Sequence, residues 1–540
     1  MTLDLETKRV IGQHFFFGFA GHEVNDEIRC LICDYYVGSV ILMKRNIKSF
    51  EQVHKLVRDL QQLAKDAGHE QPLLIGTDQE HGIVSRFSEV GTQFPGAMCI
   101  AATGSTELTE EINRASGTEL KLAGINWVYS PVADVNIDPR NPIIGPRSFG
   151  DNPTRVGEFA CAVGRALTAS GITPSPKHFP GHADTHVDSH LGLPRILKSL
   201  DELQQVELVP FKSLIAADVA TIMTGHIALP KITGSDIPCS LSRDVTTSLL
   251  REDLGFKGVV VTDCLEMNAV AQSHGVERGA LMALGAGADI AMVCHTPARQ
   301  KGAVELVRAA VASGELTLDS LRPSQGRIAR LKSKFCGSWS DVLNPVFDSG
   351  RLAQLKSVNA GLSARAYSAS TALVTDPTGI GTIPGGAAVI LFTPWNVSLN
   401  RAADDANKAP LPDVAFASFF AARTRSTQHV VYRKDFTITE ELGRSLSIAR
   451  YIVFATRNAD RSAWQLEALA AIARVKTAGT EVIIVSTSAP YDLLNVKLDF
   501  PFAYLATFEP TTPALEAVTK VIFGEVDPAG KVPVLNGNIM

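Results

Sequence analysis

The sequence lacks the features that mark membrane, secreted and nucleic-acid-binding proteins. No run approaches the roughly 18 apolar residues that cross a bilayer, and the first ten residues, MTLDLETKRV, are charged and lack the apolar core of a secretory signal. Its 51 basic and 56 acidic residues leave a net charge of −5, which offers no general attraction to nucleic acid or to an anionic membrane. We therefore expect neither kind of partner.

Cysteine is also scarce, with eight residues in a chain of 540. This excludes a disulfide-stabilised scaffold. Cys30 and Cys33 form the single C-x-x-C pair, and without a second pair or a redox motif we interpret them as ordinary buried thiols one turn apart on a helix. The simplest prediction is a reduced, cytoplasmic protein.

The cysteines are unevenly spread, since none follows Cys336. The chain is also too long for one ordinary domain. The change of composition predicts a first domain over 1–336, a linker over 337–365 and a second domain over 366–540.

Within the first domain, short β-rich runs alternate with helical patterns such as SFEQVHKLVRDLQQLAKDAG at 49–68. The predicted strands are Phe15–Phe19, Ser39–Met43, Leu73–Thr77, Trp127–Ser130, Thr173–Lys177, Thr221–Thr224, Val259–Thr262 and Ile290–Val293. Eight such units predict a (β/α)8 TIM-type barrel, whereas about six would favour a doubly wound sheet.

The second domain also alternates, and it is predicted to be a smaller α/β sandwich with a mainly parallel sheet. Its apolar runs are 388–392, 451–455, 481–486 and 502–507, and the clearest helical pattern is 463–479.

Polar residues recur where the predicted barrel strands end. They are Asp78, Asp134, Lys177, His178, His226, Asp263 and His295. Functional groups of such barrels lie at the carboxyl ends of the strands. The recurrence therefore predicts a site at that end.

The most unusual stretch is KHFPGHADTHVDSH at 177–190, with a histidine at every fourth position from His178 to His190. On a helix this spacing would favour a zinc site. Phe179-Pro180-Gly181 excludes a helix here, because proline and the residue before it disfavour helical backbone. The stretch is therefore predicted to be a loop, in which His182 and His186 structure the loop or are exposed.

Two groups in these segments are suited to acid, base or nucleophilic chemistry. Asp263 ends an apolar strand, and a carboxylate held there serves as a nucleophile, a base or a metal ligand. Asp188 lies two residues before His190, which suits an Asp–His pair in which the carboxylate orients the imidazole. A nucleophilic carboxylate with a proton-transferring partner meets the requirement of retaining glycoside hydrolysis.

Several of these motifs together resemble glycoside hydrolase family 3, in its β-N-acetylglucosaminidase branch. KHFPGHADTHVDSH is similar to the branch's K-H-F-P-G-H-G-D-T-x-x-D-S-H loop, and IGTDQEHGIVSR at 75–86 to its D-Q-E-G-G-x-V-x-R stretch. GPRSFGDNP, VVTDCLEM and DPAGKVPV also resemble family motifs, so the similarity covers about residues 10–534.

The resemblance implies a role for each matching residue. Asp263 would be the nucleophile, His190 the acid/base and Asp188 its orienting partner. The residues implied to hold the terminal sugar are Asp78, Arg86, Arg147, Lys177 and His178. We further expect Lys177, placed next to Asp263, to keep that carboxylate ionised. No metal or other cofactor is needed for this chemistry.

The sequence departs from the family pattern at three positions. His81 replaces the first glycine of Q-E-G-G, Ile83 stands where arginine is usual, and Ala183 replaces a glycine of the catalytic loop. These changes do not affect the residues implied to carry out the chemistry. They leave two properties undecided, the preference for the leaving group and the flexibility of the loop.

The implied function is that of a retaining exo-β-N-acetylglucosaminidase acting on a small glycoside, either a chitin oligosaccharide or a cell-wall fragment. The alternatives are a β-N-acetylglucosaminide phosphorylase, a family 3 β-glucosidase, a sugar-binding protein without activity and a zinc hydrolase. The sequence does not decide the oligomeric state. The chain ends soon after GKVPV, as expected for a fragment of a longer protein.

Overall fold

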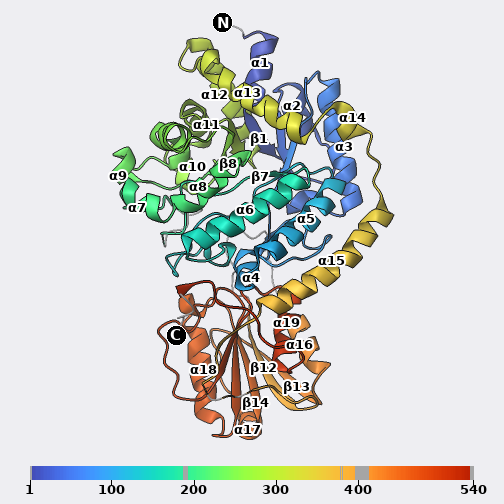
Figure 1. The fold of residues 1–540 in the computed structure, drawn as a ribbon, viewed down its shortest axis with the longest axis vertical. Helices are drawn as coiled ribbons and strands as arrows, with labels where there is room; N and C mark the ends of the chain where they lie inside the picture. Colours follow the sequence, from blue (N-terminus) through green and yellow to red (C-terminus); the bar gives the residue numbers. More distant parts are fainter. Residues whose placement is uncertain (1–2, 186–191, 378, 380, 396–412, 536–540) are drawn as a thin grey trace.

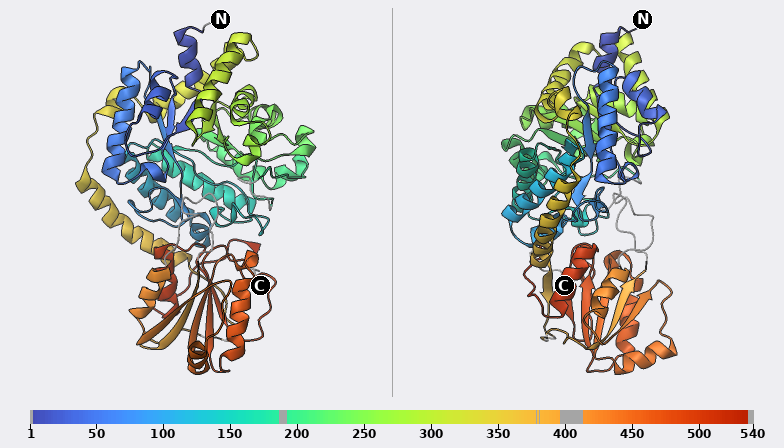
Figure 2. Two further views of the ribbon diagram at one scale, coloured as in Figure 1. Left: turned by 180° about the vertical axis from the view of Figure 1, so that it is seen from behind. Right: turned by 90° about the vertical axis from the view of Figure 1, so that its right-hand side faces the viewer.

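The computed structural model of the protein describes residues 3–185, 192–377, 379, 381–395 and 413–535. It contains two bodies of alternating helices and strands (Figure 1). The first body lies in the upper part of the view and carries the N-terminus, and the second lies below it. The same stacking is visible from behind and from the side (Figure 2).

The first body is the predicted barrel. Its parallel strands are β1 (Phe15–Gly18), β2 (Ser39–Ile41), β3 (Leu74–Thr77), β6 (Trp127–Val128), β7 (Thr173–Pro174), β8 (Thr221–Thr224), β9 (Val259–Cys264) and β10 (Ile290–Val293). They form one sheet in the order β7-β6-β3-β2-β1-β10-β9-β8. Between β8 and the segment that follows β7, Phe179 N–H donates to the Met223 carbonyl at 2.8 Å and Met223 N–H donates to the Pro176 carbonyl at 2.9 Å. These bonds nearly close the barrel, so the predicted fold is confirmed.

Five strands, β1, β2, β3, β6 and β7, are shorter than predicted, and β6 and β7 are the shortest of them. β6 and β7 span two residues each, although both were expected to run further. Prolines follow or occupy both segments, at Pro131, Pro174 and Pro176. Proline has no N–H to donate to the ladder, so regular pairing stops early.

Helices surround this sheet. They are α1 (Leu5–Gly12), α2 (Asp26–Cys33), α3 (Phe50–Asp66), α4 (Ala97–Ala102), α5 (Thr106–Leu122), α6 (Pro153–Ala169), α7 (Leu200–Gln205), α8 (Leu208–Ala216), α9 (Pro230–Thr233), α10 (Asn268–Ala271), α11 (Val276–Gly285), α12 (Pro297–Ser313) and α13 (Leu318–Phe335). Three short 3-10 helices, η1 (Lys44–Asn46), η2 (Gly145–Arg147) and η3 (Cys239–Leu241), and the π-helix η4 (Asp244–Asp253) accompany them. The predicted helix at 49–68 is α3, which begins where the Ser49 hydroxyl accepts from Gln52 N–H at 3.1 Å. No helix among the described residues is long and apolar enough to cross a bilayer.

The inside of the barrel is a packed core. Phe16 meets Trp127 and Tyr129 edge to face, with ring centroids 5.4 and 5.6 Å apart. Side chains of α13, including Leu331 and Phe335, pack into the same cluster. Side chains therefore fill the middle of the barrel.

The second body is the predicted α/β sandwich. Its strands are β11 (Ala372–Thr375), β12 (Ala388–Pro394), β13 (Ser426–Tyr432), β14 (Tyr451–Thr456), β15 (Glu481–Ser486) and β16 (Ala503–Ala506), in the order β11-β16-β15-β14-β12-β13. All neighbours are parallel except β11 and β16. The helices are α16 (Asp413–Ala421), α17 (Glu440–Ile448), α18 (Trp464–Val475) and α19 (Thr512–Ile522), with the turn η5 (Ala459–Arg461).

The residues predicted to link the two domains, 337–365, form α14 (Trp339–Leu343) and the first part of α15 (Ser349–Ser370). Figure 1 shows α15 running from the barrel to the second domain. Asn359 donates to Glu119 of α5 at 2.7 Å, and Tyr367 donates to Glu509 of the second domain at 2.8 Å. The helix therefore contacts both bodies.

Candidate active site

A cavity of about 320 Å³ opens at the carboxyl ends of the barrel strands. Six of the eight residues predicted for the site line it, namely Asp78, Arg86, Arg147, Lys177, His178 and Asp263. The other two, Asp188 and His190, lie outside the described residues. The cavity is at the end of the barrel where such proteins carry their chemistry.

A tight hairpin brings two of these residues together. After β3, the chain forms β4 (Gln79–His81) and β5 (Val84–Ser85), and the turn between them has φ +69° at His81 and φ +56° at Gly82. A Cβ atom on Gly82 would lie 2.9 Å from the Cα atom of Gly96. The turn therefore needs glycine at the second position, and at the first it holds an imidazole in left-handed backbone that glycine adopts more easily.

Five charged side chains, four of them buried and Asp78 partly exposed, form a network on one wall of the cavity. Asp78 accepts from Lys177 Nζ at 2.9 Å and from Arg86 Nη2 at 3.1 Å. Glu80 accepts two hydrogen bonds from the Arg147 guanidinium at 2.8 Å each and lies 2.6 Å from Lys177 Nζ. Three cations thus share two carboxylates, so the network keeps one surplus positive charge and presents fixed donors to a polar ligand.

The network also keeps both carboxylates ionised. Burial alone would raise the pKa of Glu80, but the charges of Arg147 and Lys177 outweigh it and lower that pKa to about 2. In the same way, Lys177 and Arg86 overcome burial and hold the pKa of Asp78 well below its usual value. The two acids therefore orient the cations at every pH at which the protein is expected to work.

The carboxylate of Asp134 orients the loop that begins with Lys177 and His178. Asp134 is fully buried and accepts from the imidazole Nδ1 of His178 at 2.7 Å. Its other oxygen accepts from the backbone N–H of His178 at 3.2 Å and of His182 at 2.7 Å. Because Nδ1 donates to Asp134, the Nε2 atom of His178 is left to meet a ligand.

Asp263 lies in β9 and lines the same cavity. Its Oδ1 atom accepts from the backbone N–H of Cys264 at 2.7 Å. Burial would raise its pKa, but His178, His226, the Cys264 N–H and Lys177 together lower it below the usual value. His226 also bonds the Cys264 carbonyl at 3.0 Å, so the backbone beside the carboxylate is fixed. Asp263 is therefore an ionised carboxylate in a defined position.

Three expectations from the sequence need correction or completion. Lys177 makes its ion pairs with Asp78 and Glu80, and its effect on the pKa of Asp263 is smaller than that of the neighbouring imidazoles. His182 is buried in the cavity wall, 3% exposed, and burial lowers its pKa to about 4. Glu80 was given no role, although the D-Q-E motif contained it, and it holds both Lys177 and Arg147.

Asn141 of the barrel connects the base of the same loop to the second domain. The side chain of Asn141 donates to the carbonyls of His182 at 3.1 Å and Thr185 at 2.7 Å. The side-chain oxygen of Asn141 accepts from two backbone N–H groups. The backbone carbonyl of Asn141 accepts from Arg461 of the second domain at 3.4 Å. This links the second domain to the start of the segment that contains Asp188 and His190.

One group of described side chains has the composition of a metal site. Cys264, Cys294 and His295 lie at the rim of the cavity, and their ligand atoms are all within 4.8 Å of one another. The sequence motifs assigned no role to the two thiols.

Comparisons with solved structures and curated proteins agree with this geometry. A fungal multi-domain GH3 β-N-acetylglucosaminidase superposes with a TM-score of 0.90 at 35% identity, over 99% of this chain and 61% of that one. A glycoside hydrolase family 3 β-N-acetylglucosaminidase from Paenibacillus sp. strain FPU-7 has a TM-score of 0.88 at 31% identity and matches 99% of both chains. Beta-hexosaminidase A of Pseudoalteromonas piscicida is 36% identical over 57% of this chain and 55% of its own length.

The beta-hexosaminidase of Neisseria meningitidis serogroup B is 33% identical over 52% of this chain and 77% of its own. The chain thus spans little more than half the length of the Pseudoalteromonas relative and 61% of the fungal structure. The profile of the glycosyl hydrolase family 3 N-terminal domain matches residues 3–331, which is more than half of the chain. This match shows that the chain belongs to glycoside hydrolase family 3, and the barrel, the cavity and its charged wall agree with it.

Proposed function

We propose that the protein is a retaining exo-β-N-acetylglucosaminidase that removes the terminal non-reducing GlcNAc from chitin oligosaccharides or cell-wall fragments. The observation that carries the proposal is the shared cavity, in which the ionised Asp263 carboxylate lies with the fixed cations Arg86, Arg147 and Lys177. The names of the similar hexosaminidases and N-acetylglucosaminidases support the same substrate class.

In the proposed reaction, an oxygen of Asp263 attacks the anomeric carbon of the terminal sugar. The bond to the leaving oxygen breaks, and His190 gives that oxygen a proton, so a neutral alcohol departs and a glycosyl-aspartate remains. Water then attacks the same carbon, gives its proton to His190 and releases the Asp263 carboxylate. Asp188 holds the imidazole in the orientation that both proton transfers need.

The sugar hydroxyls and the acetamide need donors and acceptors that water would otherwise supply. Lys177, Arg86 and Arg147 supply donors that Asp78 and Glu80 already hold in place. Such prearranged groups favour the transition state because they need no reorganisation during the reaction. The Nε2 atom of His178 offers a further contact in the same cavity, and these residues are therefore proposed to bind the terminal sugar.

The inner end of the cavity supports action at a chain end. Its lining includes Ile41, Tyr129, Met223 and Met292, and these side chains belong to the packed interior of the barrel. A polysaccharide cannot pass through this core, so a sugar enters from the mouth and the rest of the substrate stays outside. This geometry fits an exo enzyme.

The experiment that tests the proposal is a hydrolysis panel of aryl β-glycosides with and without the 2-acetamido group. We expect the 4-nitrophenyl β-glycoside of GlcNAc to be cleaved at least about 100-fold faster, in kcat/KM, than the β-glucoside, since a buried polar site left unpaired is costly. Equal rates, or a faster β-glucoside, would contradict the assignment.

Each assay is run with and without inorganic phosphate, and the products are separated. Free GlcNAc at an unchanged rate is the expected result. Sugar 1-phosphate as the main product would show that the same intermediate passes to phosphate and that the protein is a phosphorylase.

A further inference from the structure

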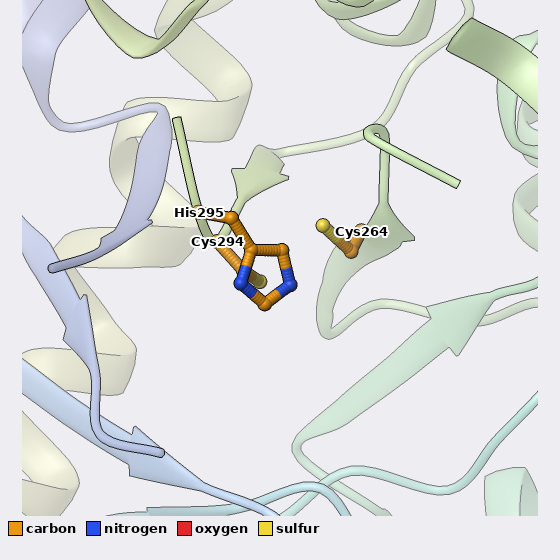
Figure 3. A group of neighbouring side chains, drawn as sticks. All are labelled: Cys264, Cys294 and His295. Atoms are coloured by element: carbon orange, nitrogen blue, oxygen red, sulfur yellow. The ribbon is translucent and has the colours of Figure 1, made fainter. Parts of the chain in front are cut away.

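The three side chains at the cavity rim come from two neighbouring strands. Cys264 is the last residue of β9 and directly follows Asp263, while Cys294 and His295 directly follow β10. The strands are parallel partners, with Met292 opposite Cys264. Because both strands end at the same edge of the barrel, the side chains converge, as Figure 3 shows.

Their chemistry and spacing fit one metal ion. The two Sγ atoms and a ring nitrogen of His295 lie within 4.8 Å of one another. In a tetrahedral zinc site the ligand atoms are about 3.7 Å apart, since Zn–S is about 2.3 Å and Zn–N about 2.0 Å. A movement of about 1 Å therefore brings all three onto one ion. Two thiolates and an imidazole select thiophilic ions such as Zn²⁺ or Cd²⁺ over Mg²⁺ or Ca²⁺.

We propose that Cys264, Cys294 and His295 bind a thiophilic divalent cation at the rim of the candidate active site, and that the bound ion inhibits cleavage. Three protein ligands leave the fourth position open toward the cavity, where water or a substrate hydroxyl completes the coordination. The ion would share that cavity with the carboxylate of Asp263. Its charge would weaken the nucleophile, and its volume would obstruct the aglycone. Metal binding is independent of the proposed function, whereas inhibition rests on it.

Near the three ligands, one group favours binding of the ion and another competes with the ion for His295. The carboxylate of Glu266 lies 3.9 Å from Cys264 Sγ and accepts from the backbone N–H of His295 at 2.6 Å. It adds negative charge and fixes the backbone of one ligand, as groups around metal ligands commonly do. Arg45 Nη1 donates to Nδ1 of His295 at 3.2 Å. An ion bound to Nε2 places the ring proton on Nδ1, so Arg45 gives up this contact when the site fills.

The direct test is titration of the reduced, chelator-treated protein with Cd²⁺, followed by the thiolate-to-metal absorption band in the near ultraviolet. Zinc is titrated in parallel by calorimetry. We expect one equivalent to bind, and the Cys264→Ser/Cys294→Ser double variant to lose the band and about 100-fold in affinity. His295→Ala changes an exposed residue, so it folds readily and should keep the band with about tenfold weaker binding.

The matched control is Cys161→Ser in α6, because Cys161 and Cys264 are both 9% exposed. It should bind both metals as the wild type does. An unchanged band in the double variant, or no band in the wild type, would overturn the proposal even if the enzyme is an active glycosidase. In the activity assay, Zn²⁺ should inhibit the wild type and a chelator should restore it. Equal inhibition of the residual activity of the double variant would place the inhibitory ion elsewhere.

Discussion

Replacing His81 should make the protein more resistant to acid. The imidazole lies in the hairpin that carries Asp78 and Arg86, is 5% exposed and packs edge to face on Phe94 at 5.6 Å. Burial lowers its pKa to about 4, although a hydrogen bond to Asn113 acts in the other direction. The folded protein therefore holds His81 neutral at pH values at which the unfolded chain protonates it.

The size of the effect follows from the two pKa values. The folded value is about 4, and the unfolded value is about 6.5. Between these values the unfolded state binds more protons, so the free energy of unfolding falls as the pH falls. The contribution of neutral His81 to the free energy of unfolding is complete above about pH 6.5 and is lost progressively toward pH 4. From pH 7 to pH 5 the loss due to His81 alone is about 1.8 kcal/mol by linkage between the two pKa values.

The assay is denaturant unfolding of the wild type and two variants, His81→Asn and His81→Gly, at pH 7 and pH 5. Both replacements tolerate the left-handed backbone and do not titrate, but they differ in packing against Phe94. Their stabilities at pH 7 will therefore differ, while each should lose about 1.8 kcal/mol less than the wild type between the two pH values. If both variants lose as much as the wild type, His81 is not held neutral and the reasoning is wrong.

Three further predictions test the site, the first of them with a control substitution. Arg147→Met leaves the buried Glu80 without its bidentate partner and should lower the free energy of unfolding by about 3–5 kcal/mol, whereas Arg140→Met removes an exposed ion pair and should cost less than about 1 kcal/mol in the same unfolding assay. Asn141→Ala removes the hydrogen bonds that hold the base of the acid/base loop and should reduce kcat about 100-fold; an unchanged kcat would show that this anchor does not position the loop. His190→Ala should slow the pre-steady-state glycosylation step much less for a nitrophenyl glycoside than for chitobiose, because only the poor leaving group needs a proton; equal slowing would mean that another residue is the acid.

The barrel was predictable because its strands are short apolar runs, and such runs are fixed by local sequence. Residues at the ends of those strands, such as Asp78, Lys177 and Asp263, could then be placed at one edge by the general rule for parallel barrels. That six predicted site residues line one cavity follows from this rule and from the family motifs.

The partners of these residues were not predictable in the same way. Glu80 meets Arg147 and Lys177, which lie 67 and 97 positions further along the chain, and the local sequence contains no sign of either contact. The signal that could have found it is the second acidic residue of a motif already assigned to the site. Likewise, β13 was missed because Ser426–Tyr432 is an edge strand with polar residues, so its apolar pattern is weak.

His182 shows a further limit. Its loop contains a proline, a glycine and many polar residues, which is typical of exposed segments. The buried Asp134 instead draws the backbone of the loop inward by accepting from His178 and His182. A contact of this kind depends on the assembled barrel, so composition alone left open whether His182 structures the loop or is exposed.

The central claim is that Asp263 forms a covalent bond to the sugar and that cleavage therefore occurs by two displacements at one carbon. Proton NMR of the first product released from an aryl N-acetyl-β-glucosaminide measures the outcome before mutarotation mixes the anomers. The account predicts that the β-anomer of GlcNAc appears first and that Asp263→Ala abolishes its formation. If the α-anomer appears first, the reaction inverts configuration, and Asp263 is not a nucleophile.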